Sequence, residues 1–297
     1  MNKFKIELEQ EIESVKNRPD KTILKISSMH PEKFLVPEVS HPEQVKHLTL
    51  DLGIFDICDD YQEVEKYLHK VDCDCVYLAH CNKCSWNIKY TDTLCKDLVN
   101  FTQLETAEFT DVNLSDNLWV EFAQNSKCLK KIEFNSCGDL DSGLDLFFFN
   151  GGNPRSHSLE PKNKALDAIV KIPTLETIKF SCLELRYFPP GPSNLKHIEL
   201  DSIKIELLDN HKEYKTELAK CYESYASNLC THTNITSLYI CFQFPIKFST
   251  FQLHKFEHLK ELSYIGDKNL DDDDCEDLKA ILKLPKFHKL KIFPINF

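Results

Sequence analysis

The sequence predicts an α/β repeat solenoid, with parallel strands along one face and helices or extended segments along the other. Two observations lead to this fold class. A short apolar pattern recurs along the chain, and its two central apolar residues alternate as in a strand. The pattern is clearest in residues 104–114, LETAEFTDVNL, where Leu104, Ala107 and Phe109 hold positions 1, 4 and 6. Such a unit cannot bury its apolar side alone, so it must stack on copies of itself.

Copies of the pattern keep the spacing of positions 1, 4 and 6, although Phe, Ile, Ala and Cys often replace Leu. Their first positions are Val45, Cys73, Leu129, Leu175, Leu195, Ile235, Leu259 and Phe287, and a weaker copy begins at Lys21. Most steps between copies lie near the roughly 20–29 residues of leucine-rich repeats. Two longer steps indicate insertions near residues 141–164 and 206–232.

Because of this repeated pattern, the chain resembles a leucine-rich repeat protein of the ribonuclease-inhibitor-like or cysteine-containing type. Cys81 and Cys137 stand at position 9, where that family places Asn or Cys. The resemblance implies a right-handed, horseshoe-like domain with strands on its concave face and helices or extended segments on its convex face. Residues 21–297 would form one such domain of about nine to ten irregular repeats.

The elements of the N-terminal half follow from periodicity and capping residues. Residues 1–20 are predicted to form a helical cap, because their apolar residues recur at helical spacing and a terminal repeat needs a polar outer side. Three prolines between residues 30 and 45 predict an extended connector. Helices are predicted over 91–101 and, after the cap residue Ser115, over 116–125.

The C-terminal half is expected to be less regular. Pro189 and Pro190 replace the expected helix of one repeat by an extended segment. An amphipathic helix of about five turns is predicted from Tyr214 to Leu229, and residues 241–256 are expected to be poor in helix. The run from Asp271 to Asp274 is interpreted as a helix N-terminus in preference to a calcium site, because acidic residues are favoured there.

Composition excludes several classes of function. The chain carries 36 Lys and Arg against 47 Asp and Glu, a formal net charge of −11, which argues against nucleic-acid binding. The first residues lack the apolar core of a signal peptide, and no stretch approaches the ~18 apolar residues of a membrane span. We therefore expect a monomeric cytoplasmic protein without membrane contact or cofactor, with reduced cysteines and with a nuclear location left open.

Two stretches carry residues that the repeated pattern does not by itself explain. Thiols at Cys73, Cys75, Cys81 and Cys84 have the spacing of a zinc site, but the repeat register directs Cys73 and Cys81 inward and Cys75 to the opposite side, so buried cysteines are favoured. The other stretch, near residues 147–157, is predicted either to add a core strand or to form an exposed binding tip. Its candidate residues are Phe147, Phe148, Phe149 and Arg155.

The predicted functional surface is the strand face that points away from the core. If positions 4 and 6 are inward, positions 3, 5 and 7 form a polar, acid-rich strip that carries tyrosines, which are enriched at binding hot spots. We predict a non-enzymatic scaffold that binds another protein through this face. The predicted contact residues are His47, Thr49, Asp51, Tyr77, Thr106, Glu108, Lys131, Glu133, Lys179, His197, Glu199 and Tyr239.

Two alternative functions remain open. Substrate-recognition subunits of ubiquitin ligases, in F-box-like leucine-rich repeat proteins, resemble this architecture, although residues 1–40 barely supply the adaptor-binding helices. The second alternative is a zinc-binding or enzymatic protein. Nucleophile motifs and glycine-rich phosphate loops are missing from the sequence, which contains only seven glycines, so no enzymatic activity is expected.

Overall fold

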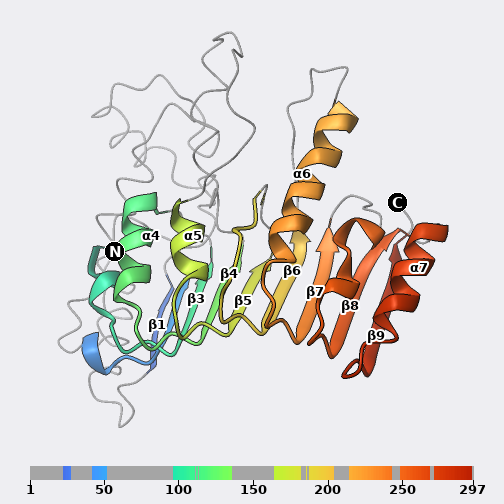
Figure 1. Cartoon of the computed structure of the whole chain (residues 1–297). Helices are drawn as coiled ribbons and strands as arrows, with labels where there is room; N and C mark the ends of the chain where they lie inside the picture. The colour runs from blue at the N-terminus through green and yellow to red at the C-terminus, as the bar shows by residue number, and fades with distance from the viewer. Residues whose placement is uncertain are drawn as a thin grey trace.

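The residues that the structure describes are built around one sheet of nine parallel strands. A computed structural model describes residues 23–27, 42–51, 96–110, 112, 114–135, 164–181, 185, 187–203, 214–242, 248–267 and 271–295. The strands lie in chain order from β1 to β9, and every neighbouring pair is parallel. Figure 1 shows them as a single row, with the helices on one side of it. This is the architecture of an α/β leucine-rich-repeat solenoid.

The strands coincide with the repeated pattern. They are β1 (Ile23–Ser27), β2 (His47–Asp51), β3 (Thr106–Thr110), β4 (Lys131–Asn135), β5 (Thr177–Ser181), β6 (His197–Ile203), β7 (Ser237–Phe242), β8 (Glu261–Asp267) and β9 (Lys289–Ile295). Positions 4 and 6 pair with their counterparts in the neighbouring strand, as Leu48 does with Ala107 and Leu50 with Phe109. Both positions are buried from β2 to β8, so the inward direction predicted for them is confirmed.

The returns between strands differ from one coil to the next. They carry the helices α4 (Asp116–Asn125), α5 (Lys164–Val170), α6 (Tyr214–Leu229) and α7 (Asp272–Ile281) and the 3-10 helices η2 (Pro42–Gln44), η4 (Lys96–Asn100), η6 (Phe248–Phe251) and η7 (Leu253–Lys255). The predicted helices 116–125 and Tyr214–Leu229 are confirmed. The helix predicted over 91–101 is only a 3-10 turn where it is described.

Local signals explain where these elements begin. The Ser115 side chain accepts a hydrogen bond from the Leu118 N–H at the start of α4. Asp271 accepts one from the Asp274 N–H, and the Asp274 carboxylate accepts one from the Asp271 N–H, which closes a capping box on α7. No helix is assigned between residues 187 and 196, in agreement with the prolines there.

Aromatic rings join the coils inside the solenoid. Phe109, Phe134 and Phe180 occupy position 6 of consecutive strands and stack with ring centroids 5.7 Å and 5.5 Å apart. Trp119 of α4 packs edge-on against both Phe109 and Phe134. The stack fixes one coil against the next, because all three rings are buried and Phe134 lies between the other two.

The order of strands around β2 differs in one place from the predicted order. The copy that begins at Cys73 predicts a strand at residues 76–78, between β2 and β3. Instead, β2 pairs directly with β3 over five residues, from His47 with Thr106 to Asp51 with Thr110. Adjacent strands lie only about 4.8 Å apart, so no strand fits between them. Residues 76–78 themselves lie outside the described residues.

Several predictions fall outside the described residues. They concern the N-terminal cap (1–20), most of the F-box-like region (1–40), Tyr77, Cys73, Cys75, Cys81, Cys84, Phe147, Phe148, Phe149 and Arg155. In the described ranges, no helix is long and apolar enough to cross a lipid bilayer.

Candidate functional site

The sheet presents an open face, defined by positions 3, 5 and 7 of strands β2–β9, on the side away from the buried residues. The parallel register places these side chains in rows that run across the strands. The position-3 row contains His47, Thr106, Lys131 and His197. The position-5 row contains Thr49, Glu108, Glu133, Lys179, Glu199 and Tyr239. The predicted contact residues other than Asp51 and Tyr77 therefore lie on one surface, and Asp51 is the last residue of β2.

Several side chains of the open face are already paired with one another. His47 Nδ1 lies 2.8 Å from Thr106 Oγ1, and Lys179 Nζ lies 2.9 Å from Glu199 Oε1. Lys131 forms an ion pair with Glu133. The hydrogen bond to Glu199 raises the pKa of Lys179 and so favours the charged form of this lysine. Such contacts hold long side chains in place and lower the entropy that a partner would have to remove on binding.

A bulge shapes the centre of the open face. The register shifts between Leu200 and Ile203 of β6, and Ser202 has a positive φ of 55°. Beside it, Asp201 accepts hydrogen bonds from the hydroxyls of Ser202 (3.3 Å) and Tyr239 (3.4 Å). Burial and then the charge of Asp201 raise the pKa of Tyr239 well above its ordinary value, so the phenol stays a hydrogen-bond donor.

The open face of β3–β7 carries an excess of negative charge. Both of its lysines, Lys131 and Lys179, are neutralised by glutamates of the same face. Two further carboxylates, Glu108 and Asp201, accept hydrogen bonds from neutral groups, Glu108 from the Asn135 amide at 3.4 Å. The face therefore combines a hydroxyl-bearing aromatic residue with two carboxylates that form no ion pair within the described residues.

A second surface feature was missed by sequence reasoning. We name the residues immediately before strands β2–β9 the start row. They are Lys46, Glu105, Lys130, Glu176, Lys196, Thr236, Lys260 and His288. The carbonyl of each start-row residue from Lys46 to Lys260 accepts two N–H groups of the next coil, as the Lys46 carbonyl does from Glu105 at 2.7 Å and Thr106 at 3.0 Å. This repeated bonding gives the start-row side chains a common direction.

Charges alternate along the first part of the start row. Glu105 lies 3.3 Å from Lys46 Nζ and 2.8 Å from Lys130 Nζ, and Glu176 lies 2.6 Å from Lys196 Nζ. Hydrogen bonds from the lysines, Lys130 first, lower the pKa of Glu105, and the Lys196 hydrogen bond lowers the pKa of Glu176. These partners come from different coils, so the chain order alone does not reveal them.

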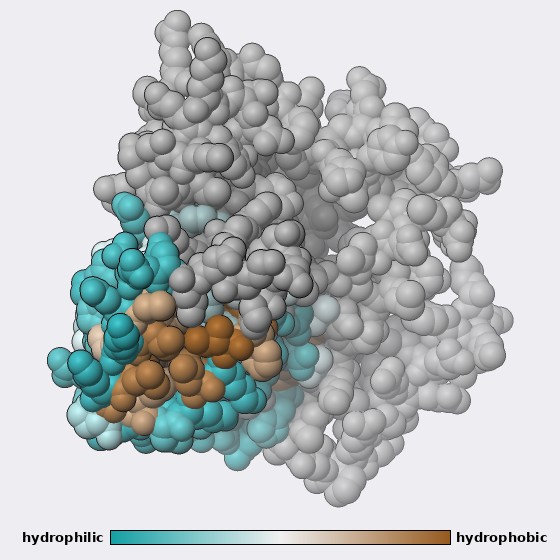
Figure 2. Space-filling view, turned by 90° about the vertical axis from the view of Figure 1, so that its right-hand side faces the viewer, coloured by the Kyte–Doolittle hydropathy of each residue, from teal (hydrophilic) through white to brown (hydrophobic). Residues whose placement is uncertain are grey.

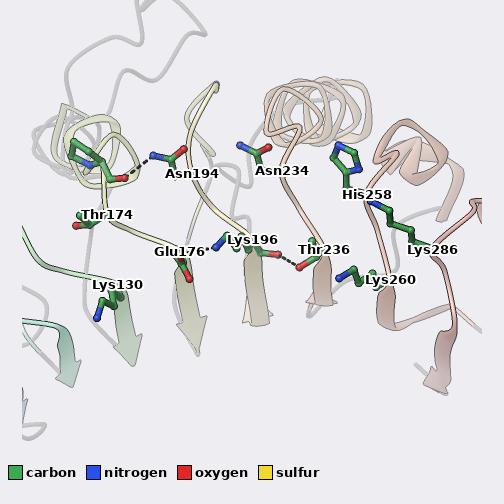
Figure 3. Close-up of a pocket in the computed structure, with 11 residues that line it drawn as sticks. Lys130, Thr174, Glu176, Asn194, Lys196, Asn234, Thr236, His258, Lys260 and Lys286 are labelled. Carbon is green, nitrogen blue, oxygen red and sulfur yellow. Dashed lines mark hydrogen bonds and ion pairs between the residues drawn. The ribbon is translucent and has the colours of Figure 1, made fainter.

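An open groove of ≈ 660 Å³ runs along the start row from β4 to β9 (Figure 3). One wall is the start row itself, and the other is formed by residues that lie two positions earlier in each coil. The groove is lined by Lys130, Pro173, Thr174, Glu176, Asn194, Lys196, Asn234, Thr236, His258, Lys260 and Lys286. Four lysines face one glutamate, so the groove is basic although the whole chain is acidic.

The last coil exposes apolar side chains. Figure 2 views the molecule from the end where β9 and α7 lie, and a hydrophobic patch with a hydrophilic surround faces the viewer. Leu282 is 56% exposed and Phe293 is 49% exposed, while Leu290 and Ile292 of β9 are only partly buried. Leu290 and Ile292 hold positions 4 and 6, which are buried in β2–β8 because another coil packs over them there.

The acidic run at α7 has a structural role. The buried Asp274 carboxylate accepts the Ser249 N–H at 2.7 Å, and Asp277 accepts the Leu253 N–H at 3.3 Å and pairs with His254. These bonds attach η6 and η7 to α7. Among the residues described, no group of three or more His, Cys, Asp or Glu is arranged to hold a metal ion.

A serine–histidine pair joins the segment before β6 to the segment before β7. His232 is fully buried, with Nε2 2.8 Å from the Pro189 carbonyl and Nδ1 2.6 Å from Ser193 Oγ. Because a carbonyl can only accept, Nε2 carries the proton and Nδ1 accepts the serine O–H. Burial lowers the pKa of His232, so the ring is neutral. Both ring nitrogens bond to residues 187–196, the segment without a helix, and His232 belongs to the following coil. The pair therefore connects that segment to the next coil.

No protein-family model and no curated protein gave a significant match to the chain. Among solved structures, it is similar to the crystal structure of a TLR13–ssRNA13 complex, with a TM-score of 0.40 and 13% sequence identity. The similarity covers 87% of this chain and 34% of that one, so this chain spans about a third of the length of that protein. The fold assignment given above rests on the order and register of the strands.

Proposed function

We propose that the protein is a non-enzymatic scaffold that binds another protein through the open face of its sheet. The observation that supports this function is the display of Glu108, Asp201 and Tyr239 on one face of a single parallel sheet, on strands β3, β6 and β7. Tyrosine combines a large apolar ring with a hydroxyl and is frequent at binding hot spots. Glu108 and Asp201 form no ion pair within the described residues, and such carboxylates favour a partner whose contact surface is basic, because charge complementarity speeds encounter and penalises wrong partners.

The test compares two variants with the same change of charge. Glu108→Lys/Asp201→Lys alters the open face, whereas Glu121→Lys/Glu223→Lys alters exposed residues of α4 and α6 on the helical side. Partners are captured from a lysate with the native chain, identified, purified and then titrated against each variant by calorimetry. Circular dichroism checks that both variants fold.

We expect the purified partner to lose affinity for the open-face variant by at least about tenfold, since a charge-assisted contact contributes about 1.5–3 kcal/mol. The helical-side variant should bind as the native chain does. Equal binding by both variants would exclude the open face as the site. The same calorimetry reports stoichiometry, and light scattering of the unbound chain tests the expected monomer.

A further inference from the structure

We infer that the groove along the start row is a second binding site, and that its ligand is an acidic peptide segment of a partner protein. A carboxylate of that segment would lie beside Thr236, between Lys196 and Lys260. The groove lies where the strands begin, and the open face is formed by the strands themselves (Figure 3). This inference therefore does not depend on the function proposed for the open face.

The alternation of charge along the start row supports this ligand. From Lys46 to Lys196 the row reads cation, anion, cation, anion, cation. Glu105 shows what an anion does there, since it bonds to one lysine in the coil before it and to another in the coil after it. The next member is Thr236, followed by Lys260. The row thus has a neutral residue at the place where its pattern requires an acid.

The lysines around Thr236 lack the neutralisation that the earlier ones have. Lys196 has Glu176 on one side only, at 2.6 Å. Within the part of the chain that the structure describes, neither Lys260 nor Lys286 has a carboxylate partner. Neighbouring ammonium groups repel each other, and an anion placed between them gains attraction from both. The site therefore favours a negatively charged group at Thr236.

Neutral donors complete the groove. Asn194 Nδ2 donates to the Pro173 carbonyl at 2.6 Å, and Asn234 Nδ2 donates to the Ser193 carbonyl at 3.0 Å. Each amide has a second N–H that these bonds do not use. The Thr236 hydroxyl donates to the Lys196 carbonyl at 3.2 Å, which leaves its oxygen lone pairs beside the groove. These side chains are held by bonds between coils, so the site is ordered before a ligand arrives.

The dimensions and charge of the groove suit a peptide better than a nucleic acid. The lining crosses the coils of β4–β9 and so extends about 24 Å at about 4.8 Å per strand, the length of roughly seven extended residues. Glu176 lies within the groove and would repel a continuous row of phosphates. A peptide can place single carboxylates next to the lysines and neutral residues next to Glu176. The net charge of −11 also opposes a polyanion at long range.

The test introduces an acidic side chain at position 236, where the start row has a neutral residue. Thr236→Glu puts a carboxylate between Lys196 and Lys260, and Thr236→Gln gives a side chain of the same size without the charge. The probe is a fluorescein-labelled decapeptide that alternates Glu and Ser, with a Gln-Ser decapeptide as its neutral counterpart. Binding is measured by fluorescence anisotropy at low salt and again at physiological salt, because screening weakens exposed ion pairs.

We expect the native chain and Thr236→Gln to bind the Glu-Ser peptide and not the Gln-Ser peptide. Thr236→Glu and Lys260→Gln should each weaken binding by about tenfold or more. Thr236→Glu should also unfold at a higher temperature than Thr236→Gln, because its carboxylate completes the row. This second measurement needs no ligand.

The inference is overturned if the native chain does not bind the Glu-Ser peptide, or if Thr236→Glu binds it as tightly as Thr236→Gln does. It is also overturned if a single-stranded oligothymidine of equal charge binds more tightly than the peptide, since the ligand would then be a phosphate chain. Thr236→Glu leaves the open face unchanged. Loss of peptide binding with retained binding of an open-face partner would therefore separate the two sites.

Discussion

Replacing Phe134 by alanine should show how the coils are held together. Phe134 is fully buried in β4, stacks on Phe109 and Phe180 at 5.7 Å and 5.5 Å, and meets the Trp119 ring at 5.4 Å. A buried Phe→Ala change costs about 3–5 kcal/mol, from lost transfer free energy and from the cavity left behind. Aromatic pairs add about 0.5–1.5 kcal/mol each. We therefore expect a loss of about 4–5 kcal/mol.

The assay is urea unfolding followed by circular dichroism and by tryptophan fluorescence. Trp119 packs on the deleted ring, so fluorescence reports the same coil directly. The control is Phe293→Ala, which removes a half-exposed ring of β9 and should cost less than about 1 kcal/mol. The reasoning is refuted if Phe134→Ala costs less than about 2 kcal/mol, or if both substitutions cost the same.

Three further predictions concern the polar contacts. Asp274→Ala leaves the Ser249 N–H without its acceptor and should cost about 2 kcal/mol in urea unfolding, whereas the exposed Asp273→Ala should cost less than about 1 kcal/mol. Ser115→Ala removes the cap of α4 and should cost about 1 kcal/mol by the same measurement; an unchanged midpoint would argue against the cap. Burial lowers the pKa of His232 below its ordinary 6.5, so its stabilisation is complete above pH 6.5 and is lost as the pH falls toward the lowered folded value. NMR titration of the ring checks this, and a pKa at or above 6.5 would contradict it.

Sequence reasoning succeeded where the signal is local. Alternation at Leu48 and Leu50, or at Ile132 and Phe134, is enough to place a strand and its inward side, because side chains of a strand alternate between two faces. The Ser115 cap and the amphipathic pattern of α6 likewise lie within a few residues of the elements that they define. The predicted open face follows from the same alternation.

Sequence reasoning failed where the answer depends on which coils are neighbours. The copy at Cys73 matches the pattern as well as others do, yet β2 and β3 pair without it. The contacts of Glu105 with Lys46 and Lys130 join residues that are 59 and 25 positions away. No periodicity indicates such a pair, because the lengths of the returns between strands vary.

The sequence by itself determined the repeating unit, the inward residues of each strand and the polar character of the opposite face. These depend on the geometry of a single strand or helix, which a few residues specify. Only the tertiary structure decided the lateral order of the side chains, and with it the rows of the open face, the start row and the neutral position of Thr236. Lateral neighbours are set by the register between coils, and that register is established only when the coils stack and bury their common core.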